Sequence, residues 1–579
     1  MKIVSNANSA ARDRSVFYRE RTWTLRRVAV VLTTMFVLVI CWQVDGARLG
    51  ILFRPATVHA LWTLLRGLFP PDLSVDFLHI VFRAFISTVA IAIAGTILSV
   101  LIAIPLGALA TPTLWRRGIL SAADKRDLIA GLRSSASRVV FASLGFLRAI
   151  PDLVWGLLFV TAVGLGSLAG TLALAVAYAG VLGRVYADAF ADVDPRPLEA
   201  LQATGATRAQ IFLRGIWPQA LPNVTAYTLY SFECCVRAAS VLGFVGAGGI
   251  GYEINLSMRL FEYRQVMTLV LSFILLLATT DATSRRLRAR LQPNTSHSRK
   301  RRQLNGNSAP QHWLGYAVLV AVVAASFYLA GFSPERFGEA DIIRNMLRFC
   351  RGMIPPDFAK DFLLSLGPLL MQTLAISILG TLMGIAIGGV LAIPATSTLV
   401  VVRPDSPGAQ SPAERGIRWS VFWAARLLLN LLRSIPDLVW VLICILVVGI
   451  GPFAGTLAIG LHTAGVLGKL YAETLEEVPS HPVEALRSLG AGPLQLLAWA
   501  LWPQAKRMIA SYTVLRWETN LRVSAILGLV GGGGLGQAIY NNVQLGFYSR
   551  LATLLLLVYF LVIASDWVGD NVFRRSVGV

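Results

Sequence analysis

The segment LRAIPDLVW (Leu147–Trp155) occurs a second time as LRSIPDLVW (Leu432–Trp440), 285 residues further along the chain. At this constant offset residues 148–254 align with residues 433–539 without a gap, and 47 of the 107 positions are identical. Two more matched pairs are AGVLGR and AGVLGK, at 179–184 and 464–469, and GFVGAGGIG and GLVGGGGLG, at 243–251 and 528–536. Self-similarity at a fixed spacing indicates an internal repeat. The chain is therefore a tandem duplication.

The composition places this duplication in a membrane. Of the 579 residues, 55% are hydrophobic and 14% are charged, whereas soluble domains carry about 25% charged residues. The mean hydropathy is +0.64. Several apolar runs reach roughly 20 residues, enough for a helix to cross a bilayer core of about 30 Å. These features exclude a soluble globular enzyme and predict an all-α polytopic membrane protein.

The apolar runs predict twelve transmembrane helices, six in each half. They are 27–44, 77–105, 139–163, 167–188, 219–244 and 262–282, then 313–332, 362–394, 419–449, 453–472, 504–529 and 547–568. An even number of spans gives two parallel repeats, related by an axis along the membrane normal. We divide the chain into a first repeat at 1–284 (core 75–284), a linker at 285–311, and a second repeat at 312–579 (core 360–570).

The net charge of +21 comes from basic residues that lie between the apolar runs. The linker alone carries eight Lys and Arg residues and no acid. This distribution follows the positive-inside rule, with anionic lipid as the counter-charge, and argues against a nucleic-acid partner. It places both termini and the linker on the cytosolic side.

Several kinds of site are not indicated by the sequence. The five cysteines are an odd number without C-x-x-C spacing, so we expect neither a disulfide framework nor a metal site. No segment matches the phosphate-binding loop G-x-x-x-x-G-K-[ST], so we expect no nucleotide cofactor in this chain. No catalytic set of side chains is recognisable, and we do not expect an enzyme.

A long polar connection follows the fourth span of each half, at Pro197–Pro222 and Pro482–Arg507. Each connection predicts a helix, a glycine break and a second helix. The acids Glu199 and Glu484 favour the positive end of the first helix, and Gly205 and Gly490 permit a backbone reversal. Short cytosolic helices at a sharp angle would suit docking of a partner; the alternative is an ordinary interfacial helix pair.

Ionisable residues within spans are rare and are therefore candidate pathway residues. They form matched pairs four residues apart, each of which we expect on one helix face: Arg148 with Asp152, Arg433 with Asp437, Glu233 with Arg237, and Glu518 with Arg522. Pro151 and Pro436 are expected to interrupt the helix, and the restarted helix would favour an anion. The alternative is that each arginine is only neutralised by its carboxylate. His462, where the first half has Ala177, is interpreted as a packing residue.

Two glycine clusters are predicted to break a helix at the outer membrane face and to let backbones approach closely at a gate. They comprise Gly246, Gly248, Gly249, Gly251, Gly531, Gly533, Gly534 and Gly536. The alternative is plain small-residue packing between helices.

The pattern E-A-L-x-x-x-G-A with a downstream W-P-Q, present in both connections, resembles the EAA loop of binding-protein-dependent ABC importer permeases. More narrowly, R-[AS]-I-P-D-L-V-W, A-G-V-L-G-[RK]-x-Y-A and [FW]-E-x-x-x-R resemble the phosphonate, phosphite and phosphate permease family. The resemblance covers about 75–290 and 360–570, as two such permeases fused in one chain.

The resemblance implies a type I importer fold and a permease subunit that forms the pathway for phosphonate, phosphite or phosphate. Its implied partners are an ATP- and Mg-binding ABC ATPase, in two copies, and a periplasmic or lipid-anchored binding protein at the bacterial inner membrane. The implied ATPase contacts are Glu199, Ala200, Gly205, Glu484, Ala485 and Gly490. The second loop has Gly492-Pro493 where the first has Thr207-Arg208, which predicts asymmetric contact.

Three alternatives remain open. An importer of another small solute, such as methionine, would share the EAA loop and a glycine-rich stretch. An ion-coupled secondary carrier would share the twelve spans in two parallel halves. An interaction scaffold or insertase would show no substrate-stimulated ATP hydrolysis.

Overall fold

The computed structural model describes residues 25–46, 49–111, 128–291, 309–332, 340–400, 412–569 and 571. All regular secondary structure in these ranges is helical, as predicted. The main helices of the first half are α2 (Leu25–Asp45), α3 (Pro55–Leu68), α4 (Val75–Ala110), α6 (Leu128–Ala149), α7 (Asp152–Val163), α8 (Ser167–Ala191), α9 (Pro195–Ala203), α10 (Arg208–Ile211), α11 (Trp217–Leu242), α12 (Ile250–Arg259) and α13 (Tyr263–Leu291). Most of the predicted linker, residues 292–308, lies outside the described residues.

The second half repeats this order. Its main helices are α15 (Ala309–Leu329), α17 (Ala340–Gly352), α18 (Lys360–Ala395), α19 (Ser397–Val400), α20 (Pro412–Ser434), α21 (Asp437–Val448), α22 (Pro452–Glu476), α23 (Ser480–Ser488), α24 (Pro493–Leu496), α25 (Trp502–Leu527), α26 (Leu535–Gln544) and α27 (Tyr548–Val568). From α4 and α18 onward most paired helices begin 285 residues apart, so the duplication extends beyond the aligned segments.

The described helices account for the predicted spans in three groups. Seven are long and apolar enough to cross a membrane, and three bent helix pairs pass the same test together. Two shorter apolar segments, Met35–Asp45 in α2 and Ala317–Leu329 in α15, lie where the first span of each half was predicted. Ten of the twelve predicted spans thus meet the full criterion within the described ranges.

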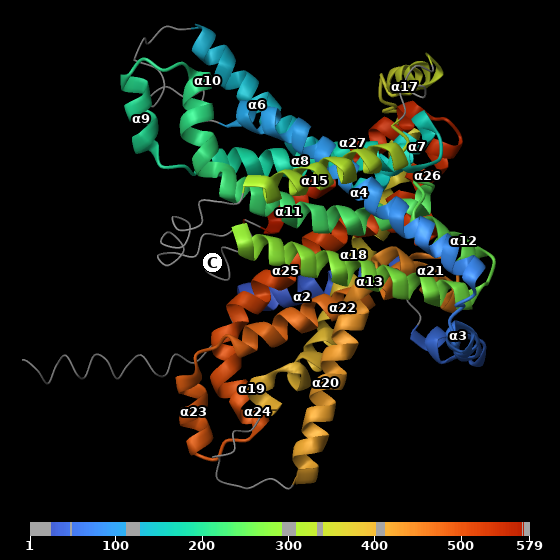
Figure 1. Cartoon of the computed structure of the whole chain (residues 1–579). Helices are drawn as coiled ribbons and strands as arrows, with labels where there is room; N and C mark the ends of the chain where they lie inside the picture. Colours follow the sequence, from blue (N-terminus) through green and yellow to red (C-terminus); the bar gives the residue numbers. More distant parts are fainter. Residues whose placement is uncertain are drawn as a thin grey trace, which may run out of the picture.

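The polar connections and the glycine clusters lie at opposite ends of the molecule (Figure 1). Helices α9 and α10 of the first half, and α23 and α24 of the second, project at one end, which we call the loop end. Helices α12 and α26 lie at the other end, the glycine end, together with α3. The long helices run between the two ends.

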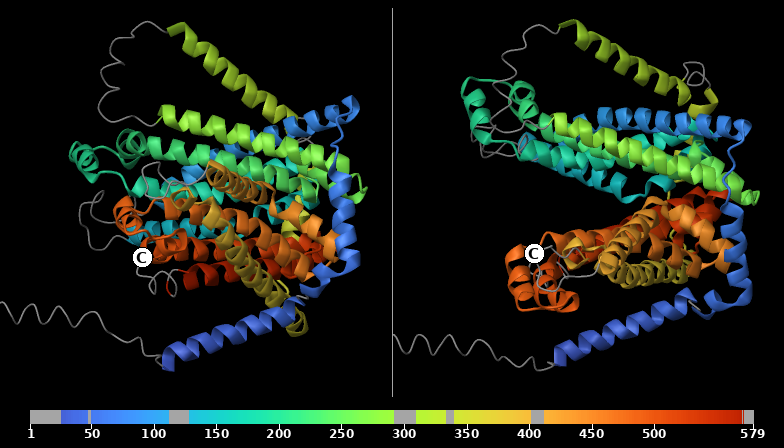
Figure 2. Two further views of the ribbon diagram at one scale, coloured as in Figure 1. Left: turned by 90° about the horizontal axis from the view of Figure 1, so that it is seen from below. Right: turned by 60° about the horizontal axis from the view of Figure 1, so that its bottom comes forward.

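The first helix of each half packs against the opposite half. Helix α2 contacts α18 of the second half, and α15 contacts α4 of the first, so that α2 and α15 lie on opposite outer sides (Figure 2). At the end of α2, Asp45 is buried, with 2% of its surface exposed. The hydroxyl of Thr456, in the second half, donates a hydrogen bond of 2.8 Å to Asp45. The halves are therefore interlocked, which no pattern in the sequence had indicated.

Two predicted spans are broken helices. The single spans expected at 139–163 and 419–449 are α6–α7, bent by 88°, and α20–α21, bent by 96°. Pro151 and Pro436 cause the bends, since proline has no N–H to continue the helix and here adopts an extended conformation that begins the next one. The interruption was predicted; its size was not.

Candidate functional site

The duplicated R-x-I-P-D-L-V-W segment builds a corner that a tryptophan closes. The indole N–H of Trp155 donates to the carbonyl oxygen of Leu147 at 3.3 Å, and Trp440 donates to Leu432 at 3.1 Å. Each bond crosses the bend and satisfies a carbonyl that the broken helix leaves without its usual partner. The motif is thus explained by the need to hold a right-angled turn inside a membrane.

The duplicated A-G-V-L-G segment supplies the surface on which this corner rests. A Cβ atom added to Gly180 would lie 2.7 Å from the backbone nitrogen of Arg148, and one added to Gly465 would lie 2.5 Å from that of Arg433. Helices α8 and α22 therefore touch the corners backbone to backbone. Only glycine permits this approach, which ties the two motifs together.

The corners contradict part of the predicted charge pairing. Arg148 and Asp152 were expected on one helix face, as were Arg433 and Asp437, but each pair is divided between two helices at the bend. Arg148 instead forms an ion pair with Asp566 at 3.3 Å, and Arg433 donates to Asn430 at 3.1 Å.

The residues of each of the two other predicted pairs share a helix, but the ion pairs that they form are with residues of a neighbouring helix. Glu233 of α11 pairs with Arg288 of α13, and Arg522 of α25 pairs with Asp566 of α27 at 3.3 Å. Helices α13 and α27 pack beside α11 and α25, which brings these partners within reach.

A first cavity, of about 540 Å³, lies between the halves, and we call it the loop-side cavity. Arg148 of the first half and Arg522 of the second share the single carboxylate of Asp566, each at 3.3 Å. Arg184 and Glu518 also line this cavity. Three guanidinium groups therefore face two carboxylates, an arrangement that favours an additional anion.

Asp566 was not predicted from the sequence, because it lies beyond the aligned segments 148–254 and 433–539. It lies 285 residues after Asp281, so the repeat itself carried a signal for both acids. In the other half, Arg433 lies within electrostatic range of Arg237 and Asp281, but no ion pair joins Arg433 to Asp281 in the described structure. The network around Asp566 is therefore asymmetric.

A second cavity, of about 290 Å³, lies where α7 and α21 begin, and we call it the central cavity. The predicted residues Asp152, Arg237 and Asp437 line it from both halves. His462 lines it too; its Nδ1 lies 3.0 Å from the carbonyl oxygen of Ile435 and 3.6 Å from an Asp437 oxygen. His462 is therefore a cavity residue as well as a packed one.

Arg516 is a central-cavity residue that was not predicted from the sequence. It takes the place of Ser231 of the first half, and its side chain is only 14% exposed. Its guanidinium lies 3.9 Å from an Asp437 oxygen and donates a long hydrogen bond, 3.4 Å, to Thr463. The available signal was an arginine within a span at a position where the other repeat has a serine.

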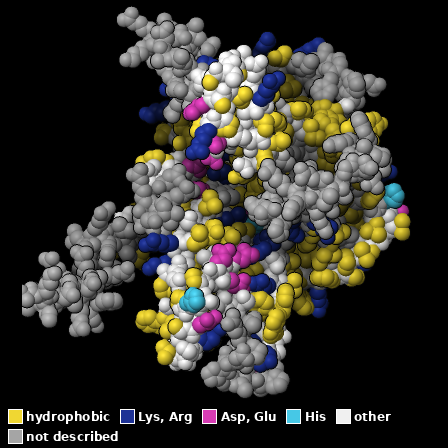
Figure 3. Space-filling model, turned by 60° about the vertical axis from the view of Figure 1, so that its left-hand side comes forward, with side chains coloured by type: hydrophobic (Ala, Val, Ile, Leu, Met, Phe, Trp, Pro, Cys, Tyr) yellow, Lys and Arg dark blue, Asp and Glu magenta, His cyan; other side chains and the backbone are white. Residues whose placement is uncertain are grey.

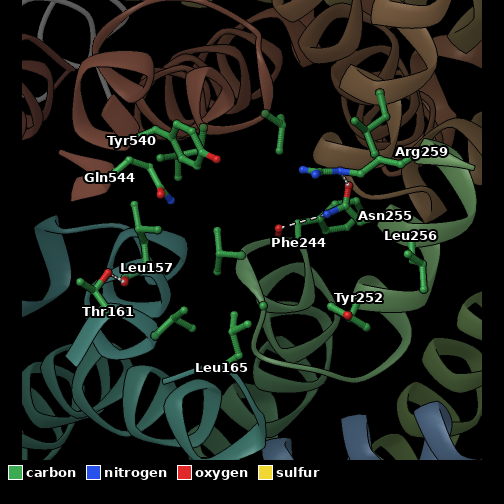
Figure 4. Close-up of a pocket in the computed structure, with 16 residues that line it drawn as sticks. Leu157, Thr161, Leu165, Phe244, Tyr252, Asn255, Leu256, Arg259, Tyr540 and Gln544 are labelled. Carbon is green, nitrogen blue, oxygen red and sulfur yellow. Dashed lines mark hydrogen bonds between the residues drawn. The ribbon is translucent and has the colours of Figure 1, made fainter. Parts of the chain in front are cut away.

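A third cavity, of about 520 Å³, opens at the glycine end, and we call it the outer cavity (Figure 4). Most of its polar side chains come from α12 and α26, where Asn255 and Arg259 of the first half face Tyr540 and Gln544 of the second, and Thr161 of α7 adds a hydroxyl group. Arg259 donates to Asn255 at 3.2 Å, which in turn donates to the carbonyl oxygen of Phe244 at 3.3 Å. One guanidinium is thus held at this entrance.

The glycine clusters form the tight junctions between α11 and α12 and between α25 and α26. Gly249 and Gly534 precede α12 and α26 with φ of +76° and +75°, a region that favours glycine. The first amide of each following helix donates to a threonine of α4 or α18 at 2.9 Å. These loops hold the ends of the helices that line the outer cavity.

The polar connections have the predicted helix, glycine break and helix. Gly205 and Gly490 lie in the break with φ of +77° and +80°. The six predicted contact residues are all exposed: Glu199, Ala200, Gly205, Glu484, Ala485 and Gly490. Leu198 and Val483 beside them are buried, at 3% and 2% exposure, and anchor each short helix to the bundle.

The two connections share a backbone shape but differ at one cap. Thr207 and Gln210 form a reciprocal capping box in the first connection. In the second, Gly492 lacks a hydroxyl, and only its amide donates to Gln495 at 2.8 Å. The surfaces presented to a partner are therefore similar in outline and different in side chains.

The sequence matches the family described as binding-protein-dependent transport system inner membrane component, over residues 118–297 and 410–577. The chain belongs to this family. Each half of the chain is matched once, and both matches include an exposed polar connection and the cavity-lining helices that follow it. The chain is accordingly the inner membrane component of a transport system, with multiple spans.

Two relatives resemble the chain over different lengths. The phosphate-import permease protein PhnE of Mycolicibacterium smegmatis is 30% identical over 542 residues, which cover 93% of each chain. The phosphite transport system permease protein PtxC of Stutzerimonas stutzeri is 37% identical over 213 residues, covering 37% of this chain and 71% of that protein. The first relative matches the whole duplicated length, and the second matches a single repeat.

A solved transport permease also resembles the chain. An inward-facing structure of the MetNI methionine ABC transporter has a chain 26% identical, with 38% of this chain and 99% of that chain covered and a TM-score of 0.32.

Proposed function

We propose that this chain forms the complete membrane pathway of an ATP-driven, binding-protein-dependent importer of a phosphorus oxyanion: phosphate, phosphite or a phosphonate. The observation that carries the proposal is the match to a phosphate-import permease over 93% of both chains. Because the duplication supplies both halves, one copy of this chain would take the place of two separate permease subunits.

The charge distribution along the interface supports an anionic substrate. Each of the three cavities is lined by at least one arginine: Arg259 in the outer cavity, Arg237 and Arg516 in the central cavity, and Arg148, Arg184 and Arg522 in the loop-side cavity. Guanidinium groups match the geometry of phosphoryl oxygens and stay charged when partly buried. Candidate pathway residues therefore occur from one end of the molecule to the other.

The loop end would be the cytosolic face. Lys and Arg side chains are scattered over this face, beside Asp and Glu, with apolar surface along one edge (Figure 3). Positive charge at one end of a bundle favours the cytosolic side, and in this proposal both termini would also be cytosolic. The glycine end, with the outer cavity, would then face the binding protein.

Each polar connection would receive one ATPase subunit, giving two per chain. The support is the pair of exposed short helices, each anchored through one buried side chain and bent at a glycine. ATP and Mg would bind to the ATPase subunits and not to this chain, which would make it a non-enzymatic subunit. The glycine junctions would act as the outer gate, because they join the lining of the outer cavity to the long helices.

The test is ATP hydrolysis by the complex copurified with its ATPase in lipid nanodiscs, with binding protein present. Phosphate, phosphite, methylphosphonate and methionine are added in turn, and a Gly205→Asp, Gly490→Asp double variant is measured in parallel. We expect stimulation by a phosphorus oxyanion that the double variant loses. Stimulation by methionine alone would retain the importer and refute the substrate class.

A further inference from the structure

The central cavity contains two basic side chains of the second half at positions that the duplication does not match. Arg516 replaces Ser231 and His462 replaces Ala177 at the repeat offset. The counterpart of Arg237 is Arg522, which lies outside this cavity and pairs with Asp566. The central cavity is therefore a single asymmetric site and not two copies of one site.

The polar atoms of this cavity are incompletely paired. One terminal nitrogen of Arg516 and one oxygen of Asp437 are fully covered, and neither has a hydrogen-bond partner. Their separation of 3.9 Å is too long for a hydrogen bond between them. Arg237 lines the same cavity and makes no hydrogen bond or ion pair with another described residue. A buried donor and a buried acceptor left open beside a cavity point to a ligand that supplies both kinds of partner.

We infer that the central cavity is an internal binding site for a protonated phosphorus oxyanion, an inference that rests on the proposed function. The unprotonated oxygens accept hydrogen bonds from Arg516 and Arg237. The P–OH group donates to the open oxygen of Asp437. The helix α21 begins at Asp437, so its amide groups add a partial positive charge at the same place.

The carboxylates give the site its selectivity. Asp437 and Asp152 both line the cavity, and they repel an oxyanion that has no proton to share. Sulfate carries no proton at neutral pH. Phosphate, phosphite and phosphonates are weaker acids that keep or readily take up a proton, so they can donate a hydrogen bond to a carboxylate. Asp152 already accepts the amide hydrogen of Leu153 at 2.9 Å, whereas one oxygen of Asp437 accepts no hydrogen bond, so Asp437 is the carboxylate that can accept from the ligand.

The test is equilibrium binding of radiolabelled phosphate to this chain in complex with its ATPase in nanodiscs, without the binding protein. Unlabelled phosphite, methylphosphonate and sulfate serve as competitors. We expect Arg516→Ser, which restores the first-half residue, to weaken phosphate binding about tenfold or more, the equivalent of one lost charge-assisted hydrogen bond. Arg516→Lys, which keeps the charge without the planar fork, should lie between Arg516→Ser and wild type. Asp437→Asn should let sulfate compete.

Two controls separate misfolding from loss of the site. Lys360→Ser removes one exposed positive charge at the start of α18 and should bind phosphate like wild type. Basal ATP hydrolysis reports whether each variant remains assembled. If wild type imports phosphorus oxyanions with binding protein present but binds none alone, or if Arg516→Ser and Asp437→Asn behave like wild type, the internal site is refuted and the proposed function stands. If wild type neither binds nor imports them, the proposed function itself fails.

Discussion

The junction between α11 and α12 has no room for a single added methyl group at Gly251. A Cβ atom there would lie 1.7 Å from the carbonyl oxygen of Ser240, whereas a carbon and an oxygen normally approach to about 3.3 Å. The overlap of roughly 1.6 Å involves backbone on both sides, so no rotamer change relieves it. We expect Gly251→Ala to exceed the usual overpacking cost of about 1–3 kcal/mol and to separate the two helices.

Two comparison variants turn this prediction into a ranking of damage. A Cβ atom at Gly536, the counterpart of Gly251, would lie 2.7 Å from the carbonyl oxygen of Ala525, a smaller overlap. At Gly248 the nearest atom would be 3.5 Å away, so alanine pays only for its φ of +78°, about 1–2 kcal/mol. Damage should therefore rank Gly251→Ala, then Gly536→Ala, then Gly248→Ala.

The assay is the fraction of complex that remains monodisperse in gel filtration after a series of heating steps, followed by ATP-dependent uptake in proteoliposomes. Gly251→Ala should lose both stability and uptake, and Gly248→Ala should keep most of each. Equal damage from Gly248→Ala and Gly251→Ala would show that backbone conformation, and not close packing, determines this junction. That result would refute the reasoning.

Three further predictions concern contacts across and beside the halves. Cleavage at a protease site inserted within 292–308 should leave the halves copurifying, because α2 packs on α18 and α15 on α4; separation in mild detergent would contradict the interlocked arrangement. Asp566→Asn should lower the free energy of unfolding by about 1–2 kcal/mol, since it leaves two part-exposed arginines unpaired. Asp281→Asn should lower this free energy less. Equal effects of the two variants would argue against the asymmetric network. The pKa of Asp357 is lowered by the Ala359 amide and by Arg550, so this carboxylate stabilises the fold above its unfolded pKa and loses that contribution as the pH falls through its folded pKa. Asp357→Asn should thus reduce heat stability at neutral pH and match wild type in acid, as measured by thermal gel filtration at both pH values; an equal deficit at both would contradict this.

The sequence was sufficient for the features that depend on local patterns. The duplication, the all-helical fold, the proline interruptions and the helix, glycine break and helix of each connection were predicted and are confirmed. Each follows from a rule that acts within a few residues: apolar run length, the missing proline N–H, or the positive φ at Gly205 and Gly490.

The errors concern contacts between segments distant in the chain. Spacing of four suggested that Arg148 pairs with Asp152, but the bend at Pro151 separates them, and Asp566 replaces Asp152 as the partner. The exchange of α2 and α15 between halves leaves no local signature, because an apolar helix fits either surface. Arg516 could have been found by asking where the repeats differ in charge within a span.

We propose that ATP hydrolysis at the loop end drives phosphorus oxyanion import through this chain. The most direct measurement is uptake of radiolabelled phosphate, phosphite and methylphosphonate into proteoliposomes that hold this chain and its ATPase, with ATP enclosed and binding protein outside. We expect uptake of at least one of these oxyanions that stops when ATP, ATPase or binding protein is omitted. Uptake that continues without ATP and follows an imposed ion gradient would contradict the account and would identify a secondary carrier.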